Sequence, residues 1–304
     1  MFTLDINYNN LINIKLFSNQ IELEARCPGI RFVATTLLAL TAAVGAVSAS
    51  YAGDVDASLR EDFERIAQRR IIFGHQSVGA NILDGVKQLS KMVGVPVNIV
   101  DVKSADSPGL AMIGHTFIAE NGKPLMKLKS FEHAMGLQAT GFDIALVKFC
   151  YVDFTVETDA QSLFASYRAT IDTLRVRHPG TTFVHITAPL TTVQDGFKSH
   201  LKRLVGNAPY GTIENLRREE YNALLRQAYS GKEPIFDLAR IESIAPDGSA
   251  VTVEWNGSSA PAMSAAYSYD GGHLNAAGKL RAARELVSVL AAIPNQAATG
   301  RQPR

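Results

Sequence analysis

The chain has few cysteines and almost no net charge, and the basic and acidic residues that it does contain are mixed along its length. A formal net charge of +1 spread in this way gives no indication of a nucleic-acid groove or an electrostatic membrane surface, so no nucleic-acid partner is expected. The hydrophobic fraction is 46% of 304 residues, which is typical of a globular chain with one large core.

The N-terminal region has the layout of a secretory signal peptide. Arg26 and Arg31 precede an apolar run over residues 32–47, and small residues follow up to Ala52. This run is shorter than the roughly 20 apolar residues of a membrane-spanning helix. We therefore expect cleavage near Ala52, a secreted or periplasmic protein, and no stable membrane insertion afterwards. Residues 1–25 do not resemble the start of a leader, which suggests a start codon assigned too far upstream.

Domain boundaries follow from this leader. We expect an N-terminal extension with the signal peptide over 1–52, one domain over 53–292 and a disordered tail over 293–304. Cleavage would remove Cys27 and leave Cys150 as the single cysteine, so no internal disulfide can form. Stability must then come from the core.

Amphipathic and apolar segments alternate along the predicted domain. Helices are predicted over 57–68, 78–93, 159–179, 212–230 and 275–293. Strands are predicted over 70–75, 95–102, 142–152, 181–190 and 234–239, with a loop-rich stretch at 104–127. Near-continuous apolar strands that alternate with helices indicate an α/β fold, in which helices cover both faces of a parallel sheet. The turns around "AVTVEW", within 244–269, predict a small β-hairpin insertion.

The stretch "FGHQSVGANILDG" places Ser77 where the first of these strands ends and a helix begins. Functional groups collect at the carboxyl ends of parallel strands, and the first amides of a helix can stabilise a developing negative charge. Alternatively, Ser77 is simply the N-cap of the helix.

A second polar stretch, "YDGGHLNAAGK", places Asp270 three residues before His273 in a glycine-rich loop. This spacing lets the carboxylate reach the imidazole Nδ1, so that Nε2 is free to take a proton from a serine. A solvated turn would have the same pattern. The pairing of a strand-end serine with this motif favours a catalytic site.

Together these segments resemble the SGNH/GDSL hydrolases. The similarity runs from about residue 70 to 290 and is carried by the turn at Ser77, the strand "FDIALVKFCYVD", the segment "VHITAPLTT" and the terminal "DGGHLN". It implies a flavodoxin-like three-layer α/β/α sandwich and a serine esterase or acyl-transfer site that needs no cofactor or metal. By this resemblance Ser77 is the nucleophile, His273 the general base and later acid, and Asp270 the carboxylate that orients the histidine.

Two departures from the family pattern concern the oxyanion site. The first block usually reads Gly-Asp-Ser, whereas His75 and Gln76 separate Gly74 from Ser77 here. Val152 stands where the family has an asparagine that donates a hydrogen bond to the oxyanion, and valine cannot do so. The candidate replacements for that donor are Gln76, Asn121 and Tyr151. Gly109, Gly114 and Gly122 compete as the second-block glycine, and Asp153 is expected to order the site through hydrogen bonds.

Other catalytic arrangements fit less well. The α/β-hydrolase elbow needs a glycine two residues before the serine, which this chain lacks. The seven histidines show no metal-ligand spacing, so no metal is expected. His75 contacts either the substrate or the backbone of its own turn, and Cys150 in a buried strand is expected to pack in the core.

The leading hypothesis is an exported serine hydrolase that cleaves an acyl or acetyl ester of a carbohydrate or envelope component. Two alternatives remain. One is acyl transfer to a glycan, in which a sugar hydroxyl replaces water. The other is a non-catalytic glycan-binding protein, suggested by the altered first block and the missing asparagine.

Overall fold

The computed structural model describes residues 13–17, 20–24, 57–102, 111–136 and 141–295. It divides into two units, Met1–Val55 and Asp56–Arg304, each considered by itself. In the first unit, β1 (Asn13–Phe17) and β2 (Gln20–Glu24) form an antiparallel hairpin. The apolar run of the expected signal peptide and its cleavage point lie outside the described residues. Within those ranges, no helix has the length and hydropathy needed to span a membrane.

The second unit is built on a sheet of six parallel strands. They are β3 (Arg70–His75), β4 (Ile99–Asp101), β5 (Met112–Phe117), β6 (Ile144–Val147), β7 (Thr182–Ile186) and β8 (Ile235–Phe236). Their order across the sheet is β4-β5-β3-β6-β7-β8. Apart from the short edge strand β4, this is the 2-1-3-4-5 order of flavodoxin-like folds.

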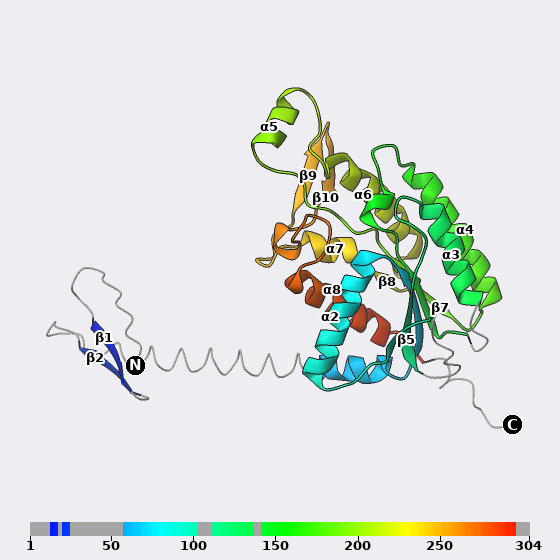
Figure 1. The fold of residues 1–304 in the computed structure, drawn as a ribbon, viewed down its shortest axis with the longest axis horizontal. Coiled ribbons are helices and arrows are strands. Elements are labelled where there is room, and N and C mark those ends of the chain that lie inside the picture. Colours follow the sequence, from blue (N-terminus) through cyan, green and yellow to red (C-terminus); the bar gives the residue numbers. More distant parts are fainter. Residues whose placement is uncertain (1–12, 18–19, 25–56, 103–110, 137–140, 296–304) are drawn as a thin grey trace. The chain divides into compact units, whose positions relative to one another are not determined.

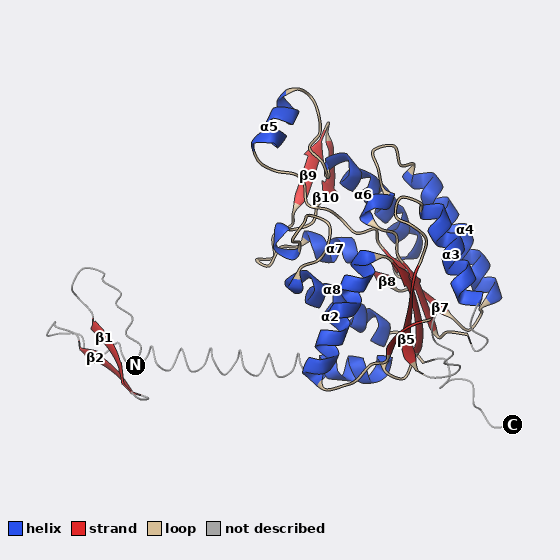
Figure 2. Cartoon of the chain, in the orientation of Figure 1, coloured by secondary structure: helices blue, strands red, loops and turns tan. Residues whose placement is uncertain are grey.

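Helices cover both faces of this sheet (Figure 1), and helices and strands alternate along the chain (Figure 2). The first face carries α2 (Ser77–Val93) and α8 (Ala276–Ala291). The second carries α3 (Pro124–Gly136), α4 (Ala160–Arg177) and α6 (Thr212–Tyr229). The predicted three-layer α/β/α sandwich is therefore confirmed.

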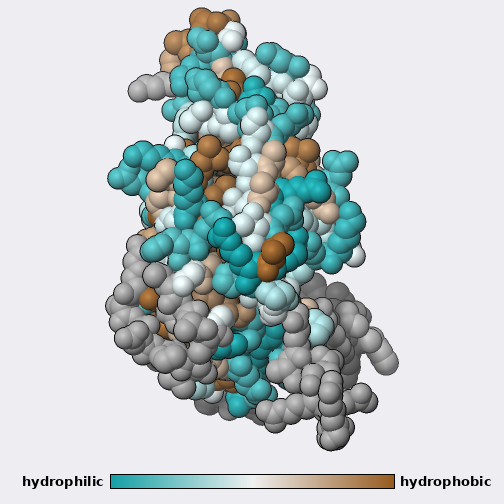
Figure 3. All heavy atoms as spheres, turned by 90° about the vertical axis from the view of Figure 1, so that its right-hand side faces the viewer, coloured by the Kyte–Doolittle hydropathy of each residue, from teal (hydrophilic) through white to brown (hydrophobic). Residues whose placement is uncertain are grey.

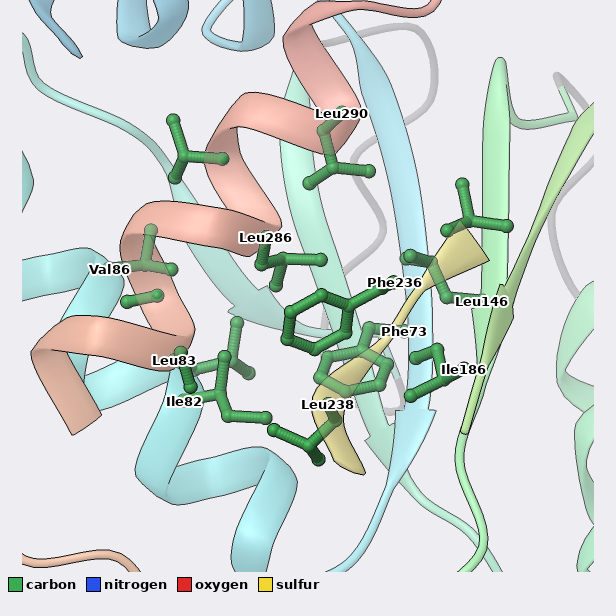
Figure 4. Close-up of a cluster of buried hydrophobic side chains, with 14 of the residues drawn as sticks. Phe73, Ile82, Leu83, Val86, Leu146, Ile186, Phe236, Leu238, Leu286 and Leu290 are labelled. Atoms are coloured by element: carbon green, nitrogen blue, oxygen red, sulfur yellow. The ribbon is translucent and has the colours of Figure 1, made fainter. Parts of the chain in front are cut away.

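Each face of the sheet has its own apolar core, because successive side chains of a strand point to opposite sides. In β3, Ile71 and Phe73 pack against the α2 and α8 layer, whereas Ile72 packs against the other layer. Figure 4 shows Phe73 of the first core beside Phe236 and Leu286. The strand that ends just before Ser77 is thus fixed from both sides.

Some elements differ from the sequence prediction. The stretch expected to be loop-rich contains β5 and the start of α3. Polar residues and Gly114 interrupt the apolar pattern of β5; a Cβ at Gly114 would lie 2.5 Å from Cγ1 of Val102, so only glycine fits without movement. Strand β6 ends at Val147 rather than continuing to residue 152, because the carboxylate of Asp153 accepts a hydrogen bond from the Cys150 amide (2.6 Å) and turns the chain.

The predicted hairpin insertion is present as β9 (Thr252–Trp255) and β10 (Ser258–Pro261). Asn256 and Gly257 join the two strands with φ values of 48° and 79°. Positive φ at both central residues is the requirement of a type I′ turn, which Asn-Gly satisfies best. The unit also contains the short helices α5 (Phe197–Leu204) and α7 (Leu238–Ser243).

Close packing of α2 against α8 sets the position of the two segments that begin these helices. A Cβ at Gly85 would lie 2.3 Å from the carbonyl oxygen of Lys279, so the helix backbones approach each other closely at this point. Lys279 also pairs with Asp84 (3.2 Å), and Asn81 accepts a hydrogen bond from the Leu274 amide (3.1 Å). These contacts hold the N-terminal end of α2 against the loop that precedes α8.

Gly85→Ala is expected to lower the free energy of unfolding by about 1 to 3 kcal/mol, because the added methyl group forces the two helices apart. Urea denaturation measures this change. Gly136→Ala is the matched control, since a Cβ there meets nothing within 4 Å. That variant should be neutral or slightly stabilising. Equal unfolding free energies for the two variants would contradict the close approach.

Candidate active site

Ser77 lies at the carboxyl end of β3, in the first turn of α2. The N-cap of α2 is Gln76, which has extended backbone angles, and no side chain caps the helix there. Ser77 is therefore one position inside the helix. Its hydroxyl is directed to His273 rather than back to its own helix.

Ser77, His273 and Asp270 lie in a chain of hydrogen bonds. Nε2 of His273 is 2.9 Å from Oγ of Ser77, and Nδ1 of His273 is 2.6 Å from Oδ2 of Asp270. The histidine and the aspartate come from the loop between the short 3-10 helix Ala265–Tyr267 and α8. A hydroxyl, an imidazole and a carboxylate at these distances can transfer a proton from the serine to the histidine.

Asp270 is held as a carboxylate. Partial burial raises its pKa, but hydrogen bonds from the amides of His273 and Gly272, together with the imidazole, outweigh burial and lower the pKa to about 2. The two amides donate to Oδ1 over 2.7 and 3.0 Å, which leaves Oδ2 for the ring. The loop backbone thus holds the carboxylate in place independently of its contact with the imidazole.

Further hydrogen bonds tie this loop to the rest of the domain. The hydroxyl of Ser268 donates to the carbonyl oxygen of His273 (2.7 Å) and accepts from the Gly271 amide (2.8 Å). The Thr192 amide donates to the carbonyl oxygen of Gly271 (2.9 Å). The bond from the Leu274 amide to Asn81 then links the loop to the helix that carries the serine.

Two tyrosines flank the imidazole of His273. The ring of Tyr151 meets it edge-on, with centroids 5.6 Å apart and an interplanar angle of 82°. Tyr269 is 68% exposed and lies nearly parallel to the imidazole, with centroids 6.1 Å apart. Burial raises the pKa of Tyr151 to about 12, so its hydroxyl stays protonated and can donate a hydrogen bond. A Cβ at Gly272 would lie 2.6 Å from Cζ of Tyr151, so glycine is needed for this contact.

Three of the oxyanion candidates have other partners. The side-chain amide of Gln76 donates to the carbonyl oxygens of Ile118 and Ala119. The amide of Gly122 donates to Asp153 (2.8 Å). Oδ1 of Asn121 accepts from Lys127. The expectation that Gln76 or Gly122 donates a hydrogen bond to the oxyanion is therefore not supported, because the N–H groups of both already have acceptors.

The remaining candidates are placed differently. Gly109 lies outside the described residues, and Gly114 lies within β5, where its amide belongs to the sheet rather than to a loop. Tyr151 is beside the imidazole and stays a candidate. In addition, the first intrahelical bond of α2 runs from the Ala80 amide to the Gln76 carbonyl (3.2 Å). The amides of Ser77 and the two residues that follow therefore have no intrahelical acceptor and can serve an anion.

Asp153 orders the turn that carries Tyr151. Its buried carboxylate pairs with buried Lys127 over 2.6 Å and also accepts from the amides of Cys150 and Gly122. These bonds join the turn after β6 to the start of α3. Cys150 itself is buried, as expected for a packing residue.

Arg218 of α6 was missed in the sequence. Its buried guanidinium donates to the carbonyl oxygen of Tyr151 (2.9 Å) and to the hydroxyl of Thr191 (2.9 Å). It thereby links the turn of Tyr151 to the segment of Thr191, whose neighbour Thr192 bonds to the loop that carries His273. The signal was a polar row at helical spacing, since Asn215, Arg218 and Asn222 share one face of α6.

His75 is a buried residue of the turn rather than a group that faces a substrate. Burial lowers its pKa to about 4, so it is neutral, and its Nδ1 bonds to the carbonyl oxygen of Gln76 (2.8 Å). Its ring stacks with His115 at a centroid distance of 5.2 Å. In the described part of the chain, no group of three or more His, Cys, Asp or Glu side chains could hold a metal ion.

Comparisons with known proteins give structural neighbours only. No protein-family model matches the chain, and no curated protein matches it. Among solved structures, one described as a lipolytic protein of the G-D-S-L family from Desulfitobacterium hafniense is 11% identical, with a TM-score of 0.42 over 72% of this chain and 97% of that one.

Two further neighbours are similarly distant. An acetyl xylan esterase is 15% identical, with a TM-score of 0.43 over 72% of this chain and 98% of its own. The periplasmic domain of a lipopolysaccharide acetyltransferase from Salmonella Paratyphi A is 13% identical, with a TM-score of 0.38 over 72% and 81%. Identities this low do not carry an activity from one chain to another.

Proposed function

We propose that this chain, which has the fold of the SGNH/GDSL hydrolases, is a serine hydrolase that cleaves an ester. One observation carries the proposal: Oγ of Ser77 and Oδ2 of Asp270 lie 2.9 and 2.6 Å from the two ring nitrogens of His273. The three roles need three different groups in this order, namely a nucleophile, a base and a carboxylate that fixes the tautomer of the base.

The reaction follows from these positions. Nε2 of His273 removes the proton of Ser77 as Oγ attacks the ester carbonyl carbon, and the carbonyl oxygen becomes an oxyanion. When the intermediate collapses, the bond to the alcohol oxygen breaks, and Nε2 returns the proton to that oxygen. Water then attacks the acyl-serine with the same histidine as base, releasing the acid and restoring the hydroxyl. Asp270 stabilises the imidazolium in both steps without taking its proton.

Oxyanion stabilisation in this mechanism comes from the first-turn amides of α2, assisted by Tyr151. Val152 offers no side-chain donor, and losing one oxyanion donor typically costs about 100- to 1,000-fold in rate. The hydroxyl of Tyr151 is protonated and its ring borders His273, so it is the side chain we assign to the missing position.

For the substrate we propose an acyl or acetyl ester of a carbohydrate or envelope component. The expected export of the chain supports such a location. The exposed ring of Tyr269 beside the imidazole supports it too, because an apolar ring face at the mouth of the site can stack against a sugar.

Covalent labelling tests the proposed nucleophile. A fluorophosphonate probe is expected to label the full-length protein, with the adduct located by mass spectrometry on Ser77. Ser166, half-buried on α4, is an internal control that should stay unlabelled. Absence of label on folded protein would overturn the serine mechanism. Supplying p-nitrophenyl acetate with and without a xylo-oligosaccharide separates hydrolysis from transfer, since transfer produces an acetylated sugar.

A further inference from the structure

Helix α5 (Phe197–Leu204) exposes an apolar surface that no part of the described chain covers. Phe197 is 80% exposed, Leu204 83%, Leu201 52% and the following residue, Val205, 68%. Figure 1 places α5 at the top of the domain, and Figure 3 shows hydrophobic atoms gathered at the same height. Scattered apolar residues are normal on a surface, but three on one short helix with a fourth directly after it are not.

In an ordinary amphipathic helix the apolar side chains face the domain, whereas in α5 they face outward. Successive residues are about 100° apart around the helix axis, so the four apolar side chains fall within an arc of about 100°. Ser199 lies about 170° from the centre of that arc, and it is only 2% exposed. The polar residue therefore faces the domain, while the apolar arc faces outward.

Positive charge borders this apolar arc. Residues 196–213 contain Lys198, Lys202 and Arg203, and the acidic residues nearest to this range are Asp195 and Glu214 at its two ends. On the helix, Lys202 lies about 60° beyond one edge of the arc and Arg203 about 100° beyond the other. The net charge of +1 for the whole chain conceals this local concentration. An apolar stripe between cations is the pattern of helices that lie in the interface of anionic membranes.

We propose that α5 is a membrane-docking element that inserts its apolar arc into an anionic lipid surface. The apolar side chains would enter the boundary between headgroups and acyl chains, while Lys202 and Arg203 pair with lipid phosphates. A second copy of the chain fits less well, because two-fold pairing would bring the same basic residues together. This docking is peripheral and distinct from spanning the bilayer.

The attachment of α5 connects such a surface to the site along the chain. The Gln194 amide bonds to the carbonyl oxygen of Tyr210 (2.9 Å) and closes the segment that carries the helix. Two residues before Gln194, Thr192 bonds to Gly271 of the loop that holds His273. A docked α5 would therefore be tethered, through residues 192–196, to the loop that holds His273. The proposal does not depend on the hydrolase activity.

A tryptophan placed on the apolar arc tests the docking in the full-length chain. In a Trp255→Phe background, Phe197→Trp makes position 197 the only tryptophan. With vesicles of phosphatidylglycerol, its emission should shift to the blue and be quenched by brominated acyl chains. Vesicles of phosphatidylcholine should give neither effect. The matched control is Val176→Trp on α4 in the same background, because Val176 is also 82% exposed. Its emission should not change with either vesicle.

Charge reversal separates lipid docking from other causes. Adding Lys202→Glu and Arg203→Glu should weaken the partition into anionic vesicles by at least about 25-fold, since each cation contributes about five-fold. Hydrolysis of a soluble ester by the doubly reversed protein should stay unchanged, so failure of the docking and failure of the proposed reaction remain distinguishable.

Three outcomes would overturn the docking proposal. The first is that anionic vesicles fail to quench the tryptophan introduced at position 197 of folded protein. The second is equal quenching on neutral vesicles or at position 176, which would show that α5 and its charges are not the cause. The third is a concentration-dependent dimer in sedimentation velocity that Phe197→Ser with Leu204→Ser dissolves, which would assign the surface to a second copy.

Discussion

Ser77→Ala is expected to lower kcat for a p-nitrophenyl ester by about 10⁴- to 10⁶-fold, the range found when the nucleophile of a serine hydrolase is removed. The physical reason is that no other hydroxyl is bonded to Nε2 of His273 within the described chain. Some rate above the uncatalysed reaction should remain, because the first-turn amides of α2 still stabilise the oxyanion when water attacks directly. Steady-state kinetics with p-nitrophenyl acetate measure the loss.

Two controls make this result specific to the nucleophile. Ser166→Ala removes a half-buried hydroxyl of α4 that donates to the carbonyl oxygen of Ser162, and it should leave kcat unchanged. The unfolding free energy of Ser77→Ala should match the wild type within about 1 kcal/mol, because Ser77 is not the N-cap and loses one partly exposed hydrogen bond. A variant with wild-type kcat would exclude Ser77 as the nucleophile.

The layer architecture was predictable because it depends on local patterns. Apolar strands that alternate with amphipathic helices indicate a parallel sheet wherever they occur, and α4 and α6 begin and end close to their predicted limits. Strand β5 was missed because its local pattern is not that of an apolar strand. Thr116 is buried and Gly114 is closely approached by Val102, and the local sequence reports neither.

The part of the candidate site that depends on residues close together in the sequence was predictable. The three residues from Asp270 to His273 suffice to bring the carboxylate to Nδ1. The oxyanion donors could not be assigned because they depend on distant segments. The side-chain amide of Gln76, for example, donates to carbonyl groups more than 40 residues along the chain. Arg218 was missed because a buried arginine on a helix gives no sign of its partners until the loops around it are placed.

Asp270→Asn is expected to lower kcat by about 10² to 10⁴-fold, less than the full effect of a buried triad carboxylate, because Asp270 is partly exposed. The asparagine Oδ1 can still accept the amides of Gly272 and His273, so the loop should keep its shape. Its NH₂ group would replace Oδ2 opposite Nδ1. Two donors cannot share that contact, so the histidine shifts its proton to Nε2 and can no longer accept one from Ser77.

The pH dependence follows from the pKa of Asp270, which its hydrogen bonds lower to about 2 from an unfolded value near 3.9. A lowered carboxyl pKa adds stability that is complete above about pH 5 and is lost as the pH falls through about 4 towards 2. The difference in unfolding free energy between wild type and Asp270→Asn should therefore be constant near neutral pH and shrink in acid. The deficit in kcat should persist across the neutral range, where the wild-type carboxylate stays ionised.

Asp247→Asn is the matched control for this substitution. Asp247 is also an exposed turn carboxylate that accepts a backbone amide, from Ser249 (2.9 Å), and hydrogen bonds to Ser249 likewise lower its pKa. It lies in the hairpin region and contacts no histidine, so its loss should leave kcat unchanged. If Asp270→Asn keeps the kcat of the wild type while Asp247→Asn does too, the carboxylate only shapes the loop. His273 would then receive its orientation from Tyr151 and Tyr269 alone.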